Sequence, residues 1–222
     1  MAGKLVNLTV HGIGTPVRPL DPGEGETWVR VDQFERVLDA VAGRPEVRLT
    51  FDDGNSSDVE IALPRLVERG LRAEFFLLAG RLGTPGSVDE AGIGKLLAAG
   101  MKIGSHGWAH RDWRRLERDQ VGEELVRAPQ ALAAHVGTPV HRVAIPFGSY
   151  DRTVLRRLRR AGVQRAYTSD GGPARERDWL QPRTSLTRDL DAAWIADVLD
   201  GSPGVRRKAR RAVAKVVKRC RG

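Results

Sequence analysis

The fold of this chain is decided by the stretch Leu49-Thr50-Phe51-Asp52-Asp53-Gly54-Asn55. It begins with β-branched and aromatic residues, as a strand does, and it ends at Gly54-Asn55, a pair typical of turns. Two adjacent carboxylates therefore lie where a strand ends. One of them can bind a cation while the other handles protons. At this point a solvated Asp-Asp-Gly turn remains the alternative.

Two histidines further along the chain favour the first interpretation. They occur in Gly104-Ser105-His106-Gly107-Trp108-Ala109-His110, four residues apart and flanked by small residues. In a helical turn or a tight loop both rings can face one cation. One carboxylate and two imidazoles leave coordination positions open for water and substrate, as a catalytic metal requires. The chain has only five histidines, so a chance pairing is less favoured.

Apolar runs and helical periodicity alternate on both sides of these motifs. Most expected helices end at a glycine, and each motif that carries chemistry follows an expected strand. Such alternation predicts a parallel sheet with helices outside it, and (β/α) barrels keep their sites at the carboxyl ends of the strands. We expect strands at 5–10, 47–51, 73–79, 102–104, 142–145 and 165–168, and helices at 34–41, 59–69, 88–99, 116–135 and 152–161.

The composition fits one α/β domain with a substantial core. It is 41% apolar and 29% charged, and it has no apolar run long enough to cross a bilayer. The lone cysteine, Cys220, excludes an internal disulfide framework. The first ten residues lack the pattern of a secretory peptide, which predicts a cytoplasmic protein.

A third motif, Pro146-Phe147-Gly148-Ser149-Tyr150, follows the strand expected at 142–145. Proline and glycine favour a sharp turn, which can present backbone N–H groups to a developing oxyanion, with Phe147 as a wall against a sugar. A purely structural turn is the alternative. Tyr150 either contacts substrate or, with Asp151 as N-cap, begins the next helix.

These three motifs, in this order and spacing, resemble those of the polysaccharide deacetylases, also called NodB-homology or carbohydrate esterase family 4 domains. The likeness spans residues 47–183. It implies a distorted, incomplete (β/α) barrel, which we expect over residues 1–200. It also implies a metal-dependent hydrolase that removes the N-acetyl group from an amino sugar.

The resemblance assigns the site residues. Asp53, His106 and His110 would hold a divalent metal, most often zinc, with cobalt or nickel as alternatives. Asp52 would take a proton from the attacking water. The residues expected near the substrate are Trp108, Pro146, Phe147, Gly148, Tyr150 and Asp170, with a purely structural turn as the alternative for Asp170.

Two departures from the family pattern place other residues in the site. The family's third motif usually has an arginine two residues before the proline, and this chain has Ala144 there. The family's last motif usually supplies a histidine as general acid, but no histidine follows Asp170. Arg183, which follows a strand-like Trp179-Leu180 and Pro182, is the candidate for orienting Asp52, with an ordinary ion pair as the alternative. His11, after the first strand, is the candidate acid or substrate contact, with a packing role as the alternative.

The last segment, 201–222, is expected to be a separate basic amphipathic helix or tail. Residues 205–222 include nine Lys or Arg and no acid, and the net charge of the whole chain is also +9. Such a helix favours peripheral contact with the inner membrane face or an acidic partner, or it packs on the barrel. Nucleic acid is a weaker expectation, because no aromatic residue interleaves the charges. With this tail, a small or lipid-linked glycoside is favoured over a long polymer.

Three other functions remain open at this stage. A hydrolase of another non-peptide C–N bond would use the same metal site. A catalytically impaired carbohydrate-binding homologue would explain the missing arginine and histidine. A membrane-recruited assembly factor would use only the tail.

Overall fold

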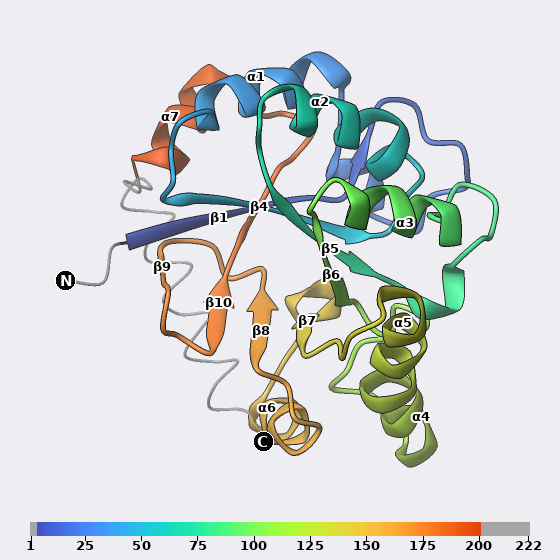
Figure 1. Ribbon diagram of the computed structural model, residues 1–222. Helices are drawn as coiled ribbons and strands as arrows, with labels where there is room; N and C mark the ends of the chain where they lie inside the picture. Colours follow the sequence, from blue (N-terminus) through green and yellow to red (C-terminus); the bar gives the residue numbers. More distant parts are fainter. Residues whose placement is uncertain (1–3, 201–222) are drawn as a thin grey trace.

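A computed structural model describes residues 4–200 of the chain. Parallel strands form the centre of the molecule, and helices lie on their outer side (Figure 1). Neighbouring strands pair in the order in which they occur from β4 to β8, because each helix returns the chain to the start of the next strand. The strands of this series are β1 (Lys4–Val10), β4 (Val47–Asp53), β5 (Ala73–Leu77), β6 (Lys102–Ser105), β7 (Arg142–Ala144) and β8 (Arg165–Thr168).

Two short strands nearly close this sheet into a barrel. β10 (Leu180–Pro182) pairs with β8 at one edge, and β11 (Thr184–Ser185) pairs with β1 at the other. Only Arg183 separates the two strands, so one residue joins the two edges of the sheet. The expected distorted (β/α) barrel is confirmed. A further strand, β9 (Ala174–Arg175), runs antiparallel to β1, and β2 (Gly12–Ile13) pairs with β3 (Trp28–Val29).

Helices surround the strands and bury their apolar faces against them (Figure 1). The first helix buries Phe34, Val37 and Leu38, with the spacing that the sequence predicted. Asp151 caps its helix as expected, accepting a hydrogen bond from Val154 N at 2.9 Å. The α-helices are α1 (Val31–Val41), α2 (Leu63–Glu68), α3 (Glu90–Ala98), α4 (Arg118–Gly122), α5 (Ala128–Val136), α6 (Arg152–Arg160) and α7 (Ala192–Leu199).

Several expected elements differ in their ends or their regularity. The helix expected at 116–135 begins at Arg118 and contains a π-helical turn, η4 (Glu123–Arg127). The helix expected at 59–69 begins as another π turn, η2 (Asp58–Ala62). The strand expected at 73–79 ends at Leu77, because the chain turns into a 3-10 segment. The 3-10 segments are η1 (Glu24–Glu26), η3 (Ala79–Arg81) and η5 (Pro146–Gly148).

The sequence analysis missed α7 and the strands β2, β3, β9 and β11. The four strands have two residues each, which is too short for an alternating pattern. The expected basic helix at 201–222 lies outside the described residues, so its structure and its expected membrane contact stay predictions. Within residues 4–200, no helix is long and apolar enough to cross a membrane.

Candidate active site

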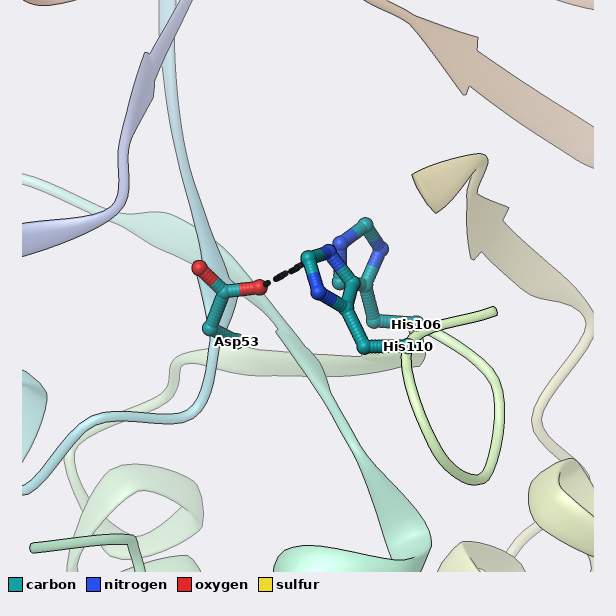
Figure 2. Close-up of side chains that lie close together, drawn as sticks. All are labelled: Asp53, His106 and His110. Atoms are coloured by element: carbon teal, nitrogen blue, oxygen red, sulfur yellow. Dashed lines mark ion pairs between the residues drawn. The ribbon is translucent and has the colours of Figure 1, made fainter. Parts of the chain in front are cut away.

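Asp53, His106 and His110 converge at the carboxyl ends of β4 and β6 (Figure 2). Asp53 Oδ1 lies 3.4 Å from Nε2 of His106 and 3.5 Å from Nε2 of His110. One ligand atom from each residue lies within 4.8 Å of the other two. Asp53 and His106 are buried, and His110 is partly exposed. An oxygen and two imidazole nitrogens at these separations can face one cation.

Backbone strain accompanies this arrangement. Within residues 4–200, the non-glycine residues with positive φ are Asp53 (74°), His110 (56°) and Phe147 (58°). Side chains other than glycine seldom adopt this conformation, and where they do, the surrounding structure holds them there. All three residues line the same cavity. The strained residues of the described chain therefore gather where the cation ligands do.

The donor set fits a divalent metal. His106 donates from Nδ1 to the carbonyl oxygen of Ala144 at 2.9 Å, which leaves Nε2 without a proton and turned toward Asp53. Burial lowers the pKa of His106 to about 3, so its ring is neutral. Burial also raises the pKa of Asp53 to about 6, assisted by the like charge of Asp52. Asp53 Oδ1 is buried without a hydrogen-bond partner in the described chain. A cation between these atoms would favour the ionised carboxylate.

Asp52, the other acid of the pair, is held by Arg183. Nη1 and Nη2 of Arg183 donate to Oδ1 and Oδ2 of Asp52, each at 2.6 Å. Both side chains are buried. Burial by itself would raise the pKa of Asp52, but the charge of Arg183 and these hydrogen bonds, with a contribution from neighbouring His106, lower it to about 2. Asp52 is therefore an ionised carboxylate in a fixed orientation.

Arg183 is itself fixed by the barrel interior. Its Nη1 donates to Thr50 Oγ1 at 3.2 Å, and its guanidinium lies over the rings of Phe76 and Tyr167, 5.4 Å and 5.7 Å from their centroids. Ala144 packs in one cluster with the same two rings. Ala144, where the resemblance implies an arginine, is therefore part of the wall beside Arg183. The contact with Asp52 comes from Arg183 instead.

His11 lies at the same cavity, beyond the end of β1. Its main-chain oxygen accepts a hydrogen bond from Asn55 Nδ2 at 2.8 Å, which ties this loop to the turn after Asp53. Its Nδ1 is buried and has no hydrogen-bond partner in residues 4–200. His11 thus brings a third imidazole to the cavity that holds Asp52 and Asp53.

The cavity has a volume of about 320 Å³ and contains only part of the expected substrate-binding set. Phe147 and Gly148 line it, with the Phe147 ring 4.3 Å from that of His110. The other four expected contacts do not line it. The Tyr150 hydroxyl donates to Asp170 Oδ2 at 2.6 Å, Pro146 is buried, and the Trp108 ring lies under the guanidinium of Arg127. The geometry therefore gives no support for direct substrate contact by Trp108, Pro146, Tyr150 or Asp170.

Gly148 and Ser149 do not offer the free N–H groups expected of the third motif. Gly148 N donates to Ile145 O and Ser149 N to Pro146 O, both at 3.0 Å. Proline has no N–H. The N–H of Phe147, which is outside these two bonds, is the remaining candidate for an oxyanion.

Glu124 is a buried acid that the sequence analysis missed. Its carboxylate accepts hydrogen bonds from the backbone N–H of Trp108 at 2.9 Å and of Ala109 at 3.0 Å, and from Trp113 Nε1 at 3.2 Å. These bonds fix the loop that carries His110. An acid in the middle of a helix was the only available signal, and it could not be told from a solvated residue.

A loop from 21 to 27 covers one side of the cavity and was also missed. It contributes Asp21 and Glu24, which pair with Arg81 and Arg18. Its proline- and glycine-rich sequence is typical of a loop but carries no signal for its position beside the site. Further lining residues outside the expected set are Thr27, Ile145, Ser169 and Ser185.

Comparison with known proteins identifies the family. Residues 39–166, more than half of the 222-residue chain, match a family model described as polysaccharide deacetylase. The chain belongs to the polysaccharide deacetylase family. All three cation-ligand candidates of this chain, with Asp52, lie inside the matched region, whereas His11 and Arg183 lie outside it.

Relatives and solved structures agree with this assignment. A chitooligosaccharide deacetylase of Bradyrhizobium is 30% identical over 145 residues, which are 64% of this chain and 62% of that protein. One of Sinorhizobium fredii is 27% identical over 175 residues, 78% of this chain and 76% of that protein. The structure of the Streptococcus pyogenes deacetylase PplD matches 91% of this chain and 100% of its own chain, with a TM-score of 0.78 at 19% identity, which supports the barrel fold.

Proposed function

We propose that this protein is a metal-dependent hydrolase that removes the N-acetyl group from an amino sugar. The observation that carries the proposal is the convergence of Asp53, His106 and His110 beside an Asp52 held by Arg183. The three ligands would hold a divalent cation, and we propose that this cation is zinc. It would lower the pKa of water and polarise the acetamide carbonyl. The deacetylase relatives favour an acetamide as the bond that is cleaved.

Asp52 serves in this proposal as the base for the attacking water. A carboxylate with a pKa of about 2 is a weak base, so its contribution depends on position. Arg183 supplies that position, because it holds both oxygens of Asp52.

His11 serves as the acid that protonates the leaving amine, since it lines the same cavity and its Nδ1 is not engaged by another described group. The N–H of Phe147 is the candidate donor to the developing oxyanion. Phe147 itself is 62% exposed and forms an apolar wall at the rim, on which a sugar ring can pack.

The size of the cavity supports a small part of a glycan as its occupant. Its volume of about 320 Å³ is at the lower end of the roughly 300–1,000 Å³ of ligand pockets. One terminal N-acetylated residue, with the rest of the glycan outside, suits this volume.

The experiment is an acetate-release assay on purified protein with N-acetylglucosaminyl oligosaccharides, with and without chelator. We expect release that chelation abolishes and a divalent cation restores. Asp52→Asn supplies the matched inactive protein. Acetamide cleavage only in non-sugar substrates would favour a hydrolase of another C–N bond. Saturable sugar binding without any acetate release would favour a carbohydrate-binding homologue.

A further inference from the structure

A second cavity opens at the other end of the barrel, at the amino ends of β4 to β8. This lower cavity has a volume of about 330 Å³ and shares no lining residue with the active-site cavity. Arg48 and Lys102, at the beginnings of strands whose far ends lead to Asp53 and His106, both line it. Its charged lining consists of Arg48, Arg72, Lys102, Arg142, Arg165, Glu74 and Glu176.

Positive charge exceeds negative charge in the lower cavity, with five basic side chains against two acidic ones. Glu176 pairs with Arg48 and Arg165. Glu74 pairs with Arg142 at 3.1 Å. Arg72 and Lys102 form no ion pair with the described residues, and both are exposed. A concave surface with such a surplus concentrates anions.

Glu74 gives the lower cavity a second, specific property. It is the second residue of the buried strand β5 and is only 6% exposed. Its Oε2 accepts hydrogen bonds from Arg142 and, at 2.9 Å, from the hydroxyl of Tyr167. Burial and the charge of Glu74 raise the pKa of Tyr167 to about 12, so this phenol stays a donor.

The other oxygen of Glu74, Oε1, is buried without a hydrogen-bond partner in residues 4–200. A buried acceptor left without a donor costs free energy, so a bound group that donates to it would be favoured. The ligand therefore needs anionic oxygens for the basic side chains and one hydroxyl hydrogen for Glu74.

We propose that the lower cavity binds a small phosphate-bearing anion that also carries a hydroxyl hydrogen. Guanidinium groups bind phosphate oxygens through paired hydrogen bonds, and lysine adds a point charge. The hydroxyl belongs either to hydrogen phosphate itself or to the alcohol of a phosphate ester. Thr50 and Tyr167 lie between this site and Arg183, and the two cavities share no lining residue. The proposed anion binding therefore does not depend on the deacetylase assignment.

Calorimetric titration of the full-length protein tests this proposal, with inorganic phosphate, glycerol phosphate and sulfate as probes at neutral pH and low ionic strength. We expect saturable binding of phosphate or glycerol phosphate, and whichever binds more tightly identifies the source of the hydroxyl. Sulfate, which has no hydrogen to donate at neutral pH, should bind about tenfold more weakly. Equal binding of sulfate would overturn the role of Glu74.

The variants Arg72→Met and Lys102→Met test whether phosphate binds in the lower cavity. Each should weaken phosphate binding by about tenfold. Lys95→Met, an equal loss of charge at an exposed position on α3, should leave it unchanged. Because the three side chains are exposed, the variants should keep the melting temperature of the wild type. Absence of saturable binding, or equal binding by all three variants, would overturn the proposal.

Discussion

The guanidinium of Arg183 binds both carboxylate oxygens of Asp52, each at 2.6 Å, although 131 residues separate the two in the chain. Arg183 is the single residue between β10 and β11, so it stands where the barrel nearly closes. Its main chain is fixed on both sides, because its N–H donates to Thr168 O and its carbonyl accepts from Gly171 N. The barrel closure thereby sets the orientation of the proposed base.

Arg183→Met should lower kcat by roughly 10²-fold while the bound metal stays. The substitution removes the contact that orients Asp52 but no cation ligand. Steady-state kinetics and metal analysis on the same sample measure the two effects. Arg183→Lys should recover part of the activity, because an ammonium keeps the charge without the two-pronged contact.

Arg175→Met, an exposed substitution of the same kind on β9, is the matched control and should be neutral. Loss of metal in Arg183→Met but not in Arg175→Met would contradict the separation of roles. Removal of a buried charge can also destabilise the protein, so melting temperatures accompany the kinetics.

Asp52→Asn should retain metal and lose roughly 10²–10⁴-fold in kcat. An amide accepts hydrogen bonds but takes up no proton from water, and the cation ligands are untouched. Metal content and acetate release decide the outcome. A variant without metal would show that Asp52 is a ligand and that the roles of the two aspartates are reversed.

Asp53→Ala, His106→Ala and His110→Ala should each lose the divalent ion, of which we expect about one per chain. The control is His135→Ala, on α5 at the protein surface, which should keep it. Elemental analysis after gel filtration measures the content. Full occupancy in all three ligand variants would refute the proposed metal site.

His11→Gln should reduce the rate with an N-acetyl sugar by roughly 10²-fold. The loss should be much smaller with an aryl acetate ester, whose leaving group departs without a proton. The backbone bond from Asn55 to the His11 carbonyl is kept in the variant. Equal losses with the amide and the ester would exclude His11 as the acid.

Asp58 makes stability depend on pH. Burial raises the pKa of Asp58 well above 3.8, and the like charges of Asp53 and Asp52 add to the shift. A carboxyl whose pKa is higher in the folded than in the unfolded state makes its full contribution to folding stability below about pH 3.8. This contribution is lost as pH rises toward the pKa of the folded state. Wild-type stability should fall relative to Asp58→Asn by up to about 1.4 kcal/mol per pH unit in this range.

Urea unfolding of both proteins at mildly acidic and at neutral pH measures this difference. The free energy of unfolding of Asp58→Asn relative to the wild type should be higher at neutral pH than at mildly acidic pH. A difference between the two proteins that does not change with pH would show that Asp58 has the same pKa in the folded and unfolded states.

The barrel and its three candidate cation ligands were predictable from the sequence because their signals are local. Asp53 ends a strand of clear apolar pattern, and His106 and His110 are four residues apart after another. Parallel strands bring their carboxyl ends to one edge, so the order of the elements was sufficient to predict that these residues meet. From its place after a strand-like segment, Arg183 was a candidate partner of Asp52, with an ordinary ion pair as an equal alternative.

Only the tertiary structure decided which side chains face the cavity. Tyr150 turns to Asp170 and not to the site, Glu124 reaches the loop before His110, and the loop from Asp21 lines one side of the cavity. The lower cavity likewise gathers residues from five strands. Short strands such as β11 carry no periodic pattern, and the direction of a side chain depends on packing against elements distant in sequence. Local sequence determines where strands end, and packing determines what meets there.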